Sequence, residues 1–320
     1  MTVPKITVMA KNADVRKENI RAVRKCFCTG GPYSLSQISR MTGLSHGAAV
    51  SVIHGLLESG EIILSEKTGN TVGRKTHKYR LNETYMHLLK LYVHRRGQAI
   101  AVRSDFTDLY GNILETDITE KGDRDLTLIA DSAERMMKKH PETDMILVSS
   151  PGVCVDGVIS NFMPEPYDAG AVLSERCRIP YVLENDVNTA CIGFSTEYPQ
   201  YRDIALIYQA DTAVFGCGLI INHELYSGAA HAAGELRWFP FMRYIENRTA
   251  AGLLKEQVLS VAALLNPEVI GWCSDATDAQ ISLTDDLPGG LIPDIIHIRD
   301  LYGMQSAGLH AIAMKSFVNA

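Results

Sequence analysis

Residues 34–58 decide the fold of the first part of the chain, and they read SLSQISRMTGLSHGAAVSVIHGLLE. Ser34 and Gln37 have the spacing of a capping box, which predicts the start of a short helix that Gly43 ends. Ser45 is placed to cap a second, longer helix. The stretch therefore predicts two helices joined by a tight turn.

The longer helix, predicted over residues 46–58, has one apolar face, because apolar side chains recur along it at helical spacing. They are Ala49, Val52, Ile53 and Leu56. The same spacing predicts a preceding helix over residues 15–28, which Gly30-Gly31-Pro32 ends. These apolar faces predict a helical core.

Two strands are predicted after the helices. Residues 61–65 and 77–81 have the composition of strands, and residues 66–74 form a turn-rich tip with glycines between them. Three helices and a two-stranded wing predict a winged helix-turn-helix, which we assign to residues 1–82.

Charge is distributed unevenly along the chain. Residues 1–82 contain 13 basic and 5 acidic residues, a net charge of +8, whereas the remainder contains 18 basic and 32 acidic residues, a net charge of −14. This asymmetry favours a polyanion, double-stranded DNA, as the partner of the first segment. A solvated basic face without a partner is the alternative that charge alone leaves open.

A winged helix binds DNA by placing its recognition helix in the major groove while the wing contacts the adjacent backbone. Phosphate contacts are predicted for Lys67, Arg74, Lys75 and Lys78 of the wing and for Ser34 and Ser36 at the start of the short helix. Contacts near base edges are predicted for Ser45, His46, Ala48 and Ser51. Because this face has no Arg, Lys, Asn or Gln for bidentate base contacts, a protein-docking module is the alternative.

Composition excludes other classes of protein. With 320 residues, 46% of them hydrophobic and 21% charged, the chain is not disordered and can form more than one core. Its longest apolar runs fall short of the roughly 18 to 20 residues that cross a bilayer. The seven scattered cysteines are not a disulfide scaffold, and Cys26 and Cys28 lack a second ligand pair at zinc spacing. We expect a cytoplasmic protein without membrane partners.

Beyond the wing, strands alternate with helices. Strands are predicted over residues 91–93, 99–106 and 145–149 and from residue 113, a helix over residues 126–139, and a linker or connecting helix over residues 82–90. This alternation predicts an α/β architecture for residues 83–320.

Motifs along nearly the whole chain, in this combination and order, resemble those of the ROK family, which joins transcriptional regulators of the NagC/XylR type to sugar kinases. The matching segments are Gly43-Leu44-Ser45, Gly73-Arg74-Lys75, Pro151-Gly152, Asp156-Gly157, Glu184-Asn185-Asp186, Gly216-Cys217-Gly218, Tyr226-Ser227-Gly228, Ala233-Gly234-Glu235 and Asn266-Pro267-Glu268. The resemblance implies an actin-like, two-lobed body of ribonuclease-H-like sheets with a sugar bound between the lobes.

The segments that hold ATP in kinases of this family are altered here. Glycine-rich turns let backbone amides approach phosphate, but the corresponding residues are His94-Arg95-Arg96-Gly97 and Thr212-Ala213-Val214. A glycine pair expected under the adenosine is replaced by Trp272-Cys273-Ser274. We therefore expect neither ATP nor another cofactor.

The family's zinc motif is altered as well. Its Glu-x-Gly-His corresponds to Glu235-Leu236-Arg237-Trp238, and the cysteine cluster that should follow is absent. The short distance from Glu235 to Asn266 implies a deleted helical stretch, so the body is expected to be truncated and without metal.

Three groups in the implied cleft, Asn185, Asp186 and Glu235, are suited to bonding sugar hydroxyls. In a kinase, Asp186 would be the general base. Alternatively, these groups persist only as hydrogen-bonding parts of the lobe interface.

The sequence thus predicts a non-enzymatic DNA-binding transcriptional regulator, a repressor of carbohydrate-related genes. We expect it to act as a homodimer or higher homo-oligomer, as a dimer on an inverted repeat, with a sugar or sugar derivative as effector. The alternatives are a ROK sugar kinase that retains Asp186 as base, and a protein-interaction scaffold.

Overall fold

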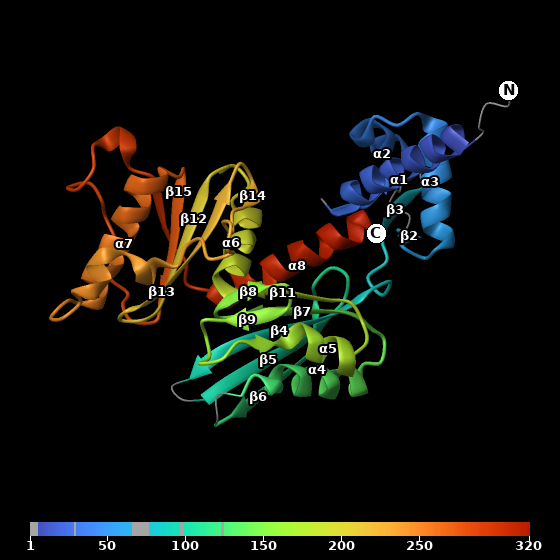
Figure 1. Ribbon diagram of the computed structural model, residues 1–320. Helices are drawn as coiled ribbons and strands as arrows, with labels where there is room; N and C mark the ends of the chain where they lie inside the picture. The colour runs from blue at the N-terminus through green and yellow to red at the C-terminus, as the bar shows by residue number, and fades with distance from the viewer. Residues whose placement is uncertain (1–5, 29, 66–76, 97–98, 123–124) are drawn as a thin grey trace. The chain divides into compact units, whose positions relative to one another are not determined.

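A computed structural model of the chain describes residues 6–28, 30–65, 77–96, 99–122 and 125–320 (Figure 1). The chain divides into two units, which we call the head and the body. The head contains residues 1–87, 107–112 and 313–320, and the body contains residues 88–106 and 113–312.

The three predicted helices of the head are present. They are α1 (Ile6–Cys28), α2 (Leu35–Thr42) and α3 (His46–Glu58). The helices α2 and α3 have the predicted caps, whereas α1 begins at Ile6, nine residues before the predicted start. The capping box of Ser34 and Gln37 is present, and Gly43 has the left-handed conformation, with φ of 71°, that glycine adopts without steric cost. The Ser45 hydroxyl accepts a hydrogen bond from the Ala48 amide at 3.3 Å.

The wing of the head is a three-stranded antiparallel sheet in the order β1-β3-β2. Its strands are β1 (Tyr33–Ser34), β2 (Ile62–Leu64) and β3 (Lys78–Leu81). The predicted strands after α3 are present. β1 was not predicted, because two residues carry no periodicity and only their pairing with β3 defines them. The predicted tip of the wing, residues 66–74, lies outside the described residues.

Residues distant in sequence complete the core of the head. Val23, Phe27, Ile53 and Leu56 from the helices pack in one apolar cluster with Phe317 near the end of α8 (Leu301–Asn319). The four apolar residues predicted for the face of α3 are all buried. The head therefore includes residues 83–87, 107–112 and 313–320 in addition to the predicted residues 1–82.

The prediction of a linker or helix over residues 82–90 is wrong. A turn closes there with a hydrogen bond from the Tyr85 amide to the Asn82 carbonyl, and β4 (His87–Arg96) begins directly after it. Leu88 and Leu89 are fully buried. A continuous apolar run of this kind does not distinguish a buried strand from a helix, and the burial of both strand faces decides here.

The first lobe of the body is a five-stranded sheet in the order β11-β7-β4-β5-β6. The strands that join β4 are β5 (Ala99–Thr107), β6 (Ile113–Lys121), β7 (Thr143–Ser150) and β11 (Tyr181–Asn185). The helices α4 (Thr127–Lys139) and α5 (Ala169–Arg176) pack with the sheet in one apolar core (Figure 1). A small antiparallel sheet is formed by β8 (Val153–Val155), β9 (Val158–Ser160) and β10 (Tyr167–Asp168).

The second lobe is a five-stranded sheet in the order β14-β13-β12-β15-β16. Its strands are β12 (Ile204–Asp211), β13 (Val214–Ile221), β14 (Glu224–Leu225), β15 (Val269–Ser274) and β16 (Asp294–His297). The helices α6 (Asp186–Glu197) and α7 (Ala250–Leu265) belong to different apolar clusters and cover opposite faces of the sheet (Figure 1). A Cβ at Gly218 would lie 2.5 Å from the Cβ of Cys191, so glycine on β13 permits the close approach of α6.

Two short 3-10 turns, Leu236–Trp238 and Pro240–Arg243, lie between β14 and α7. A third, Gly289–Leu291, lies between β15 and β16. Among the described residues, no helix has both the length and the apolar character that crossing a bilayer requires.

Candidate functional site

The surface of the head around the turn between α2 and α3 is open to solvent. Ser36, Ser45, His46 and Ser51 are exposed, and Ala48 is half-buried. All of these side chains belong to α2, to α3 or to the turn, so the helix-turn-helix presents them on a continuous segment. This is the segment from which a winged helix contacts the major groove.

Ser34 requires a correction. It is only 6% exposed, and its hydroxyl lies 3.0 Å from the hydroxyl of Ser36 and accepts a hydrogen bond from the Gln37 amide. The capping role therefore uses the oxygen that was predicted to contact phosphate. Ser36 remains accessible for that contact.

One side of α3 forms a groove with α1. The groove has a volume of about 350 Å³, and Ala48, Ser51 and Gly55 line it together with Val15 and Asn19 of α1. The surface is open because small residues occupy α3. A Cβ added at Gly55 would have no neighbouring atom within 4 Å in the described part of the chain.

The wing supplies fewer described cations than predicted. Lys78 is on β3 and half-buried, whereas Lys67, Arg74 and Lys75 lie outside the described residues. Arg40, in the last turn of α2, was not predicted. It is exposed and has no ion-pair partner in the part of the chain that the structure describes. The sequence signal that could have predicted a phosphate contact for Arg40 is its position as a cation in the helix that precedes the turn.

A second candidate site is a small cavity in the body. Its volume is about 20 Å³, which accommodates about one water molecule. The residues that line it are Gly152, Val153, Asn185, Asn188, Gly216, Cys217, His231, Ala233, Gly234 and Glu235. Asn185 and Glu235 were predicted for this cleft; Asn188 and His231 were not, although Asn188 lies one helical turn into α6 from Asn185.

Asn185 links the two lobes' elements around this cavity. As the N-cap of α6, its side-chain oxygen accepts hydrogen bonds from the amides of Val187 and Asn188, both at 3.0 Å. Its side-chain nitrogen donates to the carbonyl of Gly152 at 2.8 Å. Both ends of the Asn185 amide are therefore engaged, and a sugar hydroxyl bound there must share or replace one of these bonds.

Asp186 does not line the cavity. Its side chain is 8% exposed, and one carboxylate oxygen accepts a hydrogen bond from the Val187 amide at 2.9 Å. Burial raises the pKa of the Asp186 carboxyl to about 6, and the charge of Glu235 acts in the same direction. The three predicted cleft residues are thus neighbours, but only Asn185 and Glu235 face the cavity.

Glu235 is held by an ion pair with Arg237, whose guanidinium nitrogen lies 3.0 Å from a carboxylate oxygen. The backbone beside it is closely packed, because a Cβ at Gly234 would lie 1.8 Å from the carbonyl oxygen of Cys217. Trp238, which follows the ion pair, is 73% exposed. The segment Leu236–Trp238 is therefore a 3-10 turn that ends in an exposed aromatic side chain.

The segments that the resemblance matches to nucleotide loops were predicted to be altered, and their local structures are as follows. Between β12 and β13 the Thr212 amide donates to the side chain of Asp211 at 2.7 Å, so this amide is already used. Trp272, on β15, is 2% exposed and stacks on His297 with ring centroids 3.8 Å apart. His94 and Arg95 continue β4 as a strand, whereas Gly97 lies outside the described residues.

Metal ligands do not cluster in the described part of the chain: no group of three or more His, Cys, Asp or Glu side chains is suitably placed to hold an ion there. Cys26 is buried and Cys28 is exposed.

A winged-helix head and a body with two five-stranded sheets form the architecture that the resemblance to the ROK family implies. Comparison with known proteins confirms this resemblance, although no family model matches the chain. The chain is similar to the xylose repressor of Bacillus spizizenii, with 22% identity over 248 residues that cover 71% of this chain and 62% of the repressor.

Among solved structures, a ROK family transcriptional regulator described as a homologue of the E. coli MLC protein matches with a TM-score of 0.67 and 14% identity, covering 95% of this chain and 98% of that one. A ROK family glucokinase from Streptomyces griseus, in complex with glucose and AMPPNP, matches with a TM-score of 0.51 and 14% identity, covering 70% of this chain and 98% of the kinase. The match to the regulator covers 95% of this chain, whereas the match to the kinase covers 70%.

Proposed function

We propose that this chain is a DNA-binding transcriptional repressor of carbohydrate-related genes. The observation that carries the proposal is the exposed α2-turn-α3 segment within residues 1–82, which have a net charge of +8 on a chain of net charge −6. Similarity to xylose repressors supports the same function.

In this proposal, the head contacts DNA through two kinds of residue. Ser45, His46, Ala48 and Ser51 lie near base edges, and Ser36, Arg40 and Lys78 contact phosphates. The wing residues Lys67, Arg74 and Lys75 remain predicted phosphate contacts. The protein acts as a homodimer, because two heads one helical turn apart match an inverted repeat.

A sugar or sugar derivative acts as the effector by binding in the cleft. A cavity of about 20 Å³ is far smaller than the roughly 300 Å³ of the smallest typical ligand sites, so binding requires the cleft to open. The ligand must also compete with Arg237 for Glu235. It shifts DNA affinity only if it prefers one arrangement of the lobes, which is what cleft opening supplies.

The protein is not a kinase in this proposal. A sugar kinase that uses Asp186 as general base is the second candidate, and the raised pKa of Asp186 favours it. Three features oppose it: the engaged Thr212 amide, the buried Trp272, and the position of Asp186 outside the cavity. Coupled measurement of ATP turnover with pentoses, hexoses and amino sugars decides; turnover that Asp186→Asn abolishes would establish the kinase.

The repressor function is tested by incubating the full-length protein with fragmented genomic DNA and sequencing the bound fragments. We expect enrichment of sites with inverted repeats upstream of genes for sugar uptake or breakdown, and a changed sequence preference for His46→Ala. Release of the bound fragments by one sugar of a panel identifies the effector. Uniform recovery of all fragments at every salt concentration would refute the proposal.

A further inference from the structure

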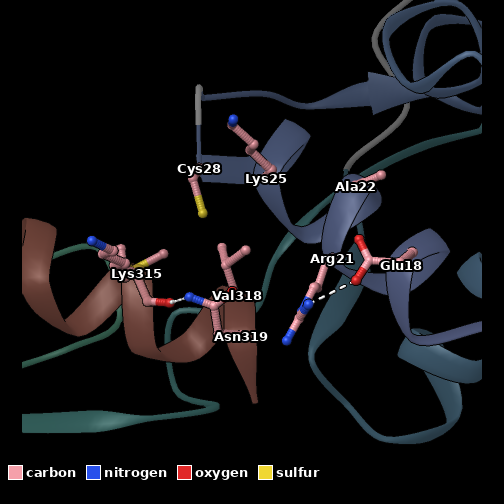
Figure 2. A pocket seen from close by; sticks show the side chains of 9 residues that line it. Glu18, Arg21, Ala22, Lys25, Cys28, Lys315, Val318 and Asn319 are labelled. Carbon is pink, nitrogen blue, oxygen red and sulfur yellow. Dashed lines mark hydrogen bonds and ion pairs between the residues drawn. The ribbon is translucent and has the colours of Figure 1, made fainter. Parts of the chain in front are cut away.

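The head contains a second pocket, which α1 and the end of α8 form (Figure 2). We call it the α1–α8 pocket. Its volume is about 580 Å³, within the range of roughly 300 to 1,000 Å³ that is typical of small-molecule sites. None of the residues that line it is among those proposed to contact DNA, so the DNA-binding role does not account for it.

The two helices expose this pocket because other side chains hold them in the core. On α1, Val23 and Phe27 are buried in the head, while Arg21, Ala22 and Lys25 face the pocket. On α8, Phe317 is buried in the head. The pocket is lined on this helix by Met314, Lys315, Val318 and Asn319. Ala22, Met314 and Val318 give the pocket an apolar floor, which a ligand's hydrocarbon part would cover.

The charged residues of the pocket are mainly cationic. Arg21 is paired with Glu18 at 2.7 Å, as Figure 2 shows. Lys25 and Lys315 are exposed and make no ion pair with any residue in the described part of the chain. Three cations against one carboxylate leave a net charge of +2.

Two further groups affect the preference for charge. Both helices end beside the pocket, and their last carbonyls bring partial negative charge, which the lysines offset. Cys28 also lines the pocket. Although the residue is exposed, neighbouring atoms desolvate its thiol and raise its pKa to about 11, so the thiol is neutral near pH 7 and does not repel an anion. The excess positive charge of the pocket is therefore carried by the flexible side chains of Lys25 and Lys315, next to the apolar residues Ala22, Met314 and Val318.

We propose that the α1–α8 pocket binds a small amphiphilic anion, an alkyl or aryl carboxylate or phosphate. Its charged group is bound by Lys25 and Lys315, and its hydrocarbon part covers Ala22, Met314 and Val318. This ligand site belongs to the head and is distinct from the sugar cleft of the body, so it stands whether or not the cleft binds a sugar.

The proposal is tested by titrating anilinonaphthalene sulfonate, a fluorescent anion with an apolar body, into the full-length protein. Bound dye is then displaced with octanoate, hexyl phosphate, octylammonium or octan-1-ol. We expect octanoate, hexyl phosphate or both to displace the dye at concentrations at least tenfold lower than the other two compounds. The better of the two anions identifies a carboxylate or a phosphate as the natural chemistry.

Variants locate the binding. The double variant Lys25→Gln, Lys315→Gln should weaken dye binding at least tenfold, and Ala22→Phe should do the same by filling the floor. Lys17→Gln is the matched control, because Lys17 is exposed on α1 but does not line the pocket. Circular dichroism checks that each variant is folded.

Two results would overturn the proposal. One is dye affinity in both pocket variants equal to that of Lys17→Gln. The other, which needs no variant, is displacement by octylammonium as effective as displacement by octanoate.

Discussion

Two glycines in α3 lie where a helix normally excludes them. Gly47 and Gly55 have nothing within 4 Å of a Cβ that would be added, so no contact within the described chain requires glycine. Each costs on the order of 1 kcal/mol relative to alanine in a helix interior. A requirement from outside the chain, the approach of a DNA duplex to the start of α3, explains Gly47 in our account.

We therefore predict that Gly55→Ala and Gly47→Ala each stabilise the protein by about 1 kcal/mol, measured by urea denaturation. Only Gly47→Ala should also weaken DNA binding, because it lies in the first turn of α3, next to His46. Equal DNA affinity of the two variants would show that the duplex does not approach this turn closely.

Asp186 gives the stability of the protein a dependence on pH. Because the folded-state pKa is raised from 3.8 to about 6, the folded protein holds a proton that the unfolded chain releases between these values. The contribution of this carboxyl to stability is therefore complete below about pH 4 and falls as the pH rises to about 6.

Asp186→Asn should remove this dependence, since the amide keeps the acceptor oxygen for the Val187 amide and carries no charge. We predict that the variant gains stability over the wild type on the order of 2 to 3 kcal/mol between pH 4 and pH 7. Denaturation curves at a series of pH values measure the difference. Parallel pH profiles for the two proteins would contradict the burial of this carboxyl.

At the scale of elements, the end of α8 is part of the head. Phe317 is 3% exposed, the Arg24 guanidinium lies 5.2 Å from the centre of its ring, and Arg24 donates to its carbonyl at 3.2 Å. Arg24 also forms a mostly buried ion pair with Glu61 at 2.8 Å. These contacts join α1, the residue that precedes β2 and the end of α8.

Phe317→Ala should destabilise the head by about 3 to 5 kcal/mol, the usual cost of removing a buried phenylalanine. Asn319→Ala, an exposed change in the same helix, should alter stability by less than about 0.5 kcal/mol. Chemical denaturation of the full-length protein gives both values. Similar stability of the two variants would mean that the head does not depend on α8.

Elements with strong local signals could be predicted from the sequence, and those that depend on distant partners could not. The cap of Ser34, the turn at Gly43 and the apolar face of α3 are encoded by neighbouring residues. β1 exists only through its pairing with β3, and the role of Phe317 in the head depends on packing with a segment nearly 300 residues away in sequence.

The candidate sites follow the same division. The motifs that carry the resemblance predicted Asn185 and Glu235 for one cleft, and both line the same cavity. The motifs do not reveal that Asp186, one residue further, is turned into the protein, nor that the Ser34 hydroxyl is consumed by its own helix. Side-chain direction depends on the geometry at the start of each helix, which residue types alone do not determine.

At the scale of the whole molecule, the opposite charges of the two parts of the sequence separate their roles. The segment of net charge +8 attracts a polyanion, and the remainder, of net charge −14, repels one. Binding to DNA is therefore expected to depend on the head, and the body is free to respond to a smaller ligand.

The most direct test of this account is the affinity of the full-length protein for an enriched operator fragment, measured by fluorescence anisotropy over a range of salt concentrations. We predict an affinity that falls linearly on a log-log plot, with a slope that Arg40→Gln makes shallower by about 1. Lys138→Gln, an exposed change in α4 of the body, should leave the slope unchanged. No binding at about 50 mM salt, or the same slope for the wild type and Arg40→Gln, would contradict the account.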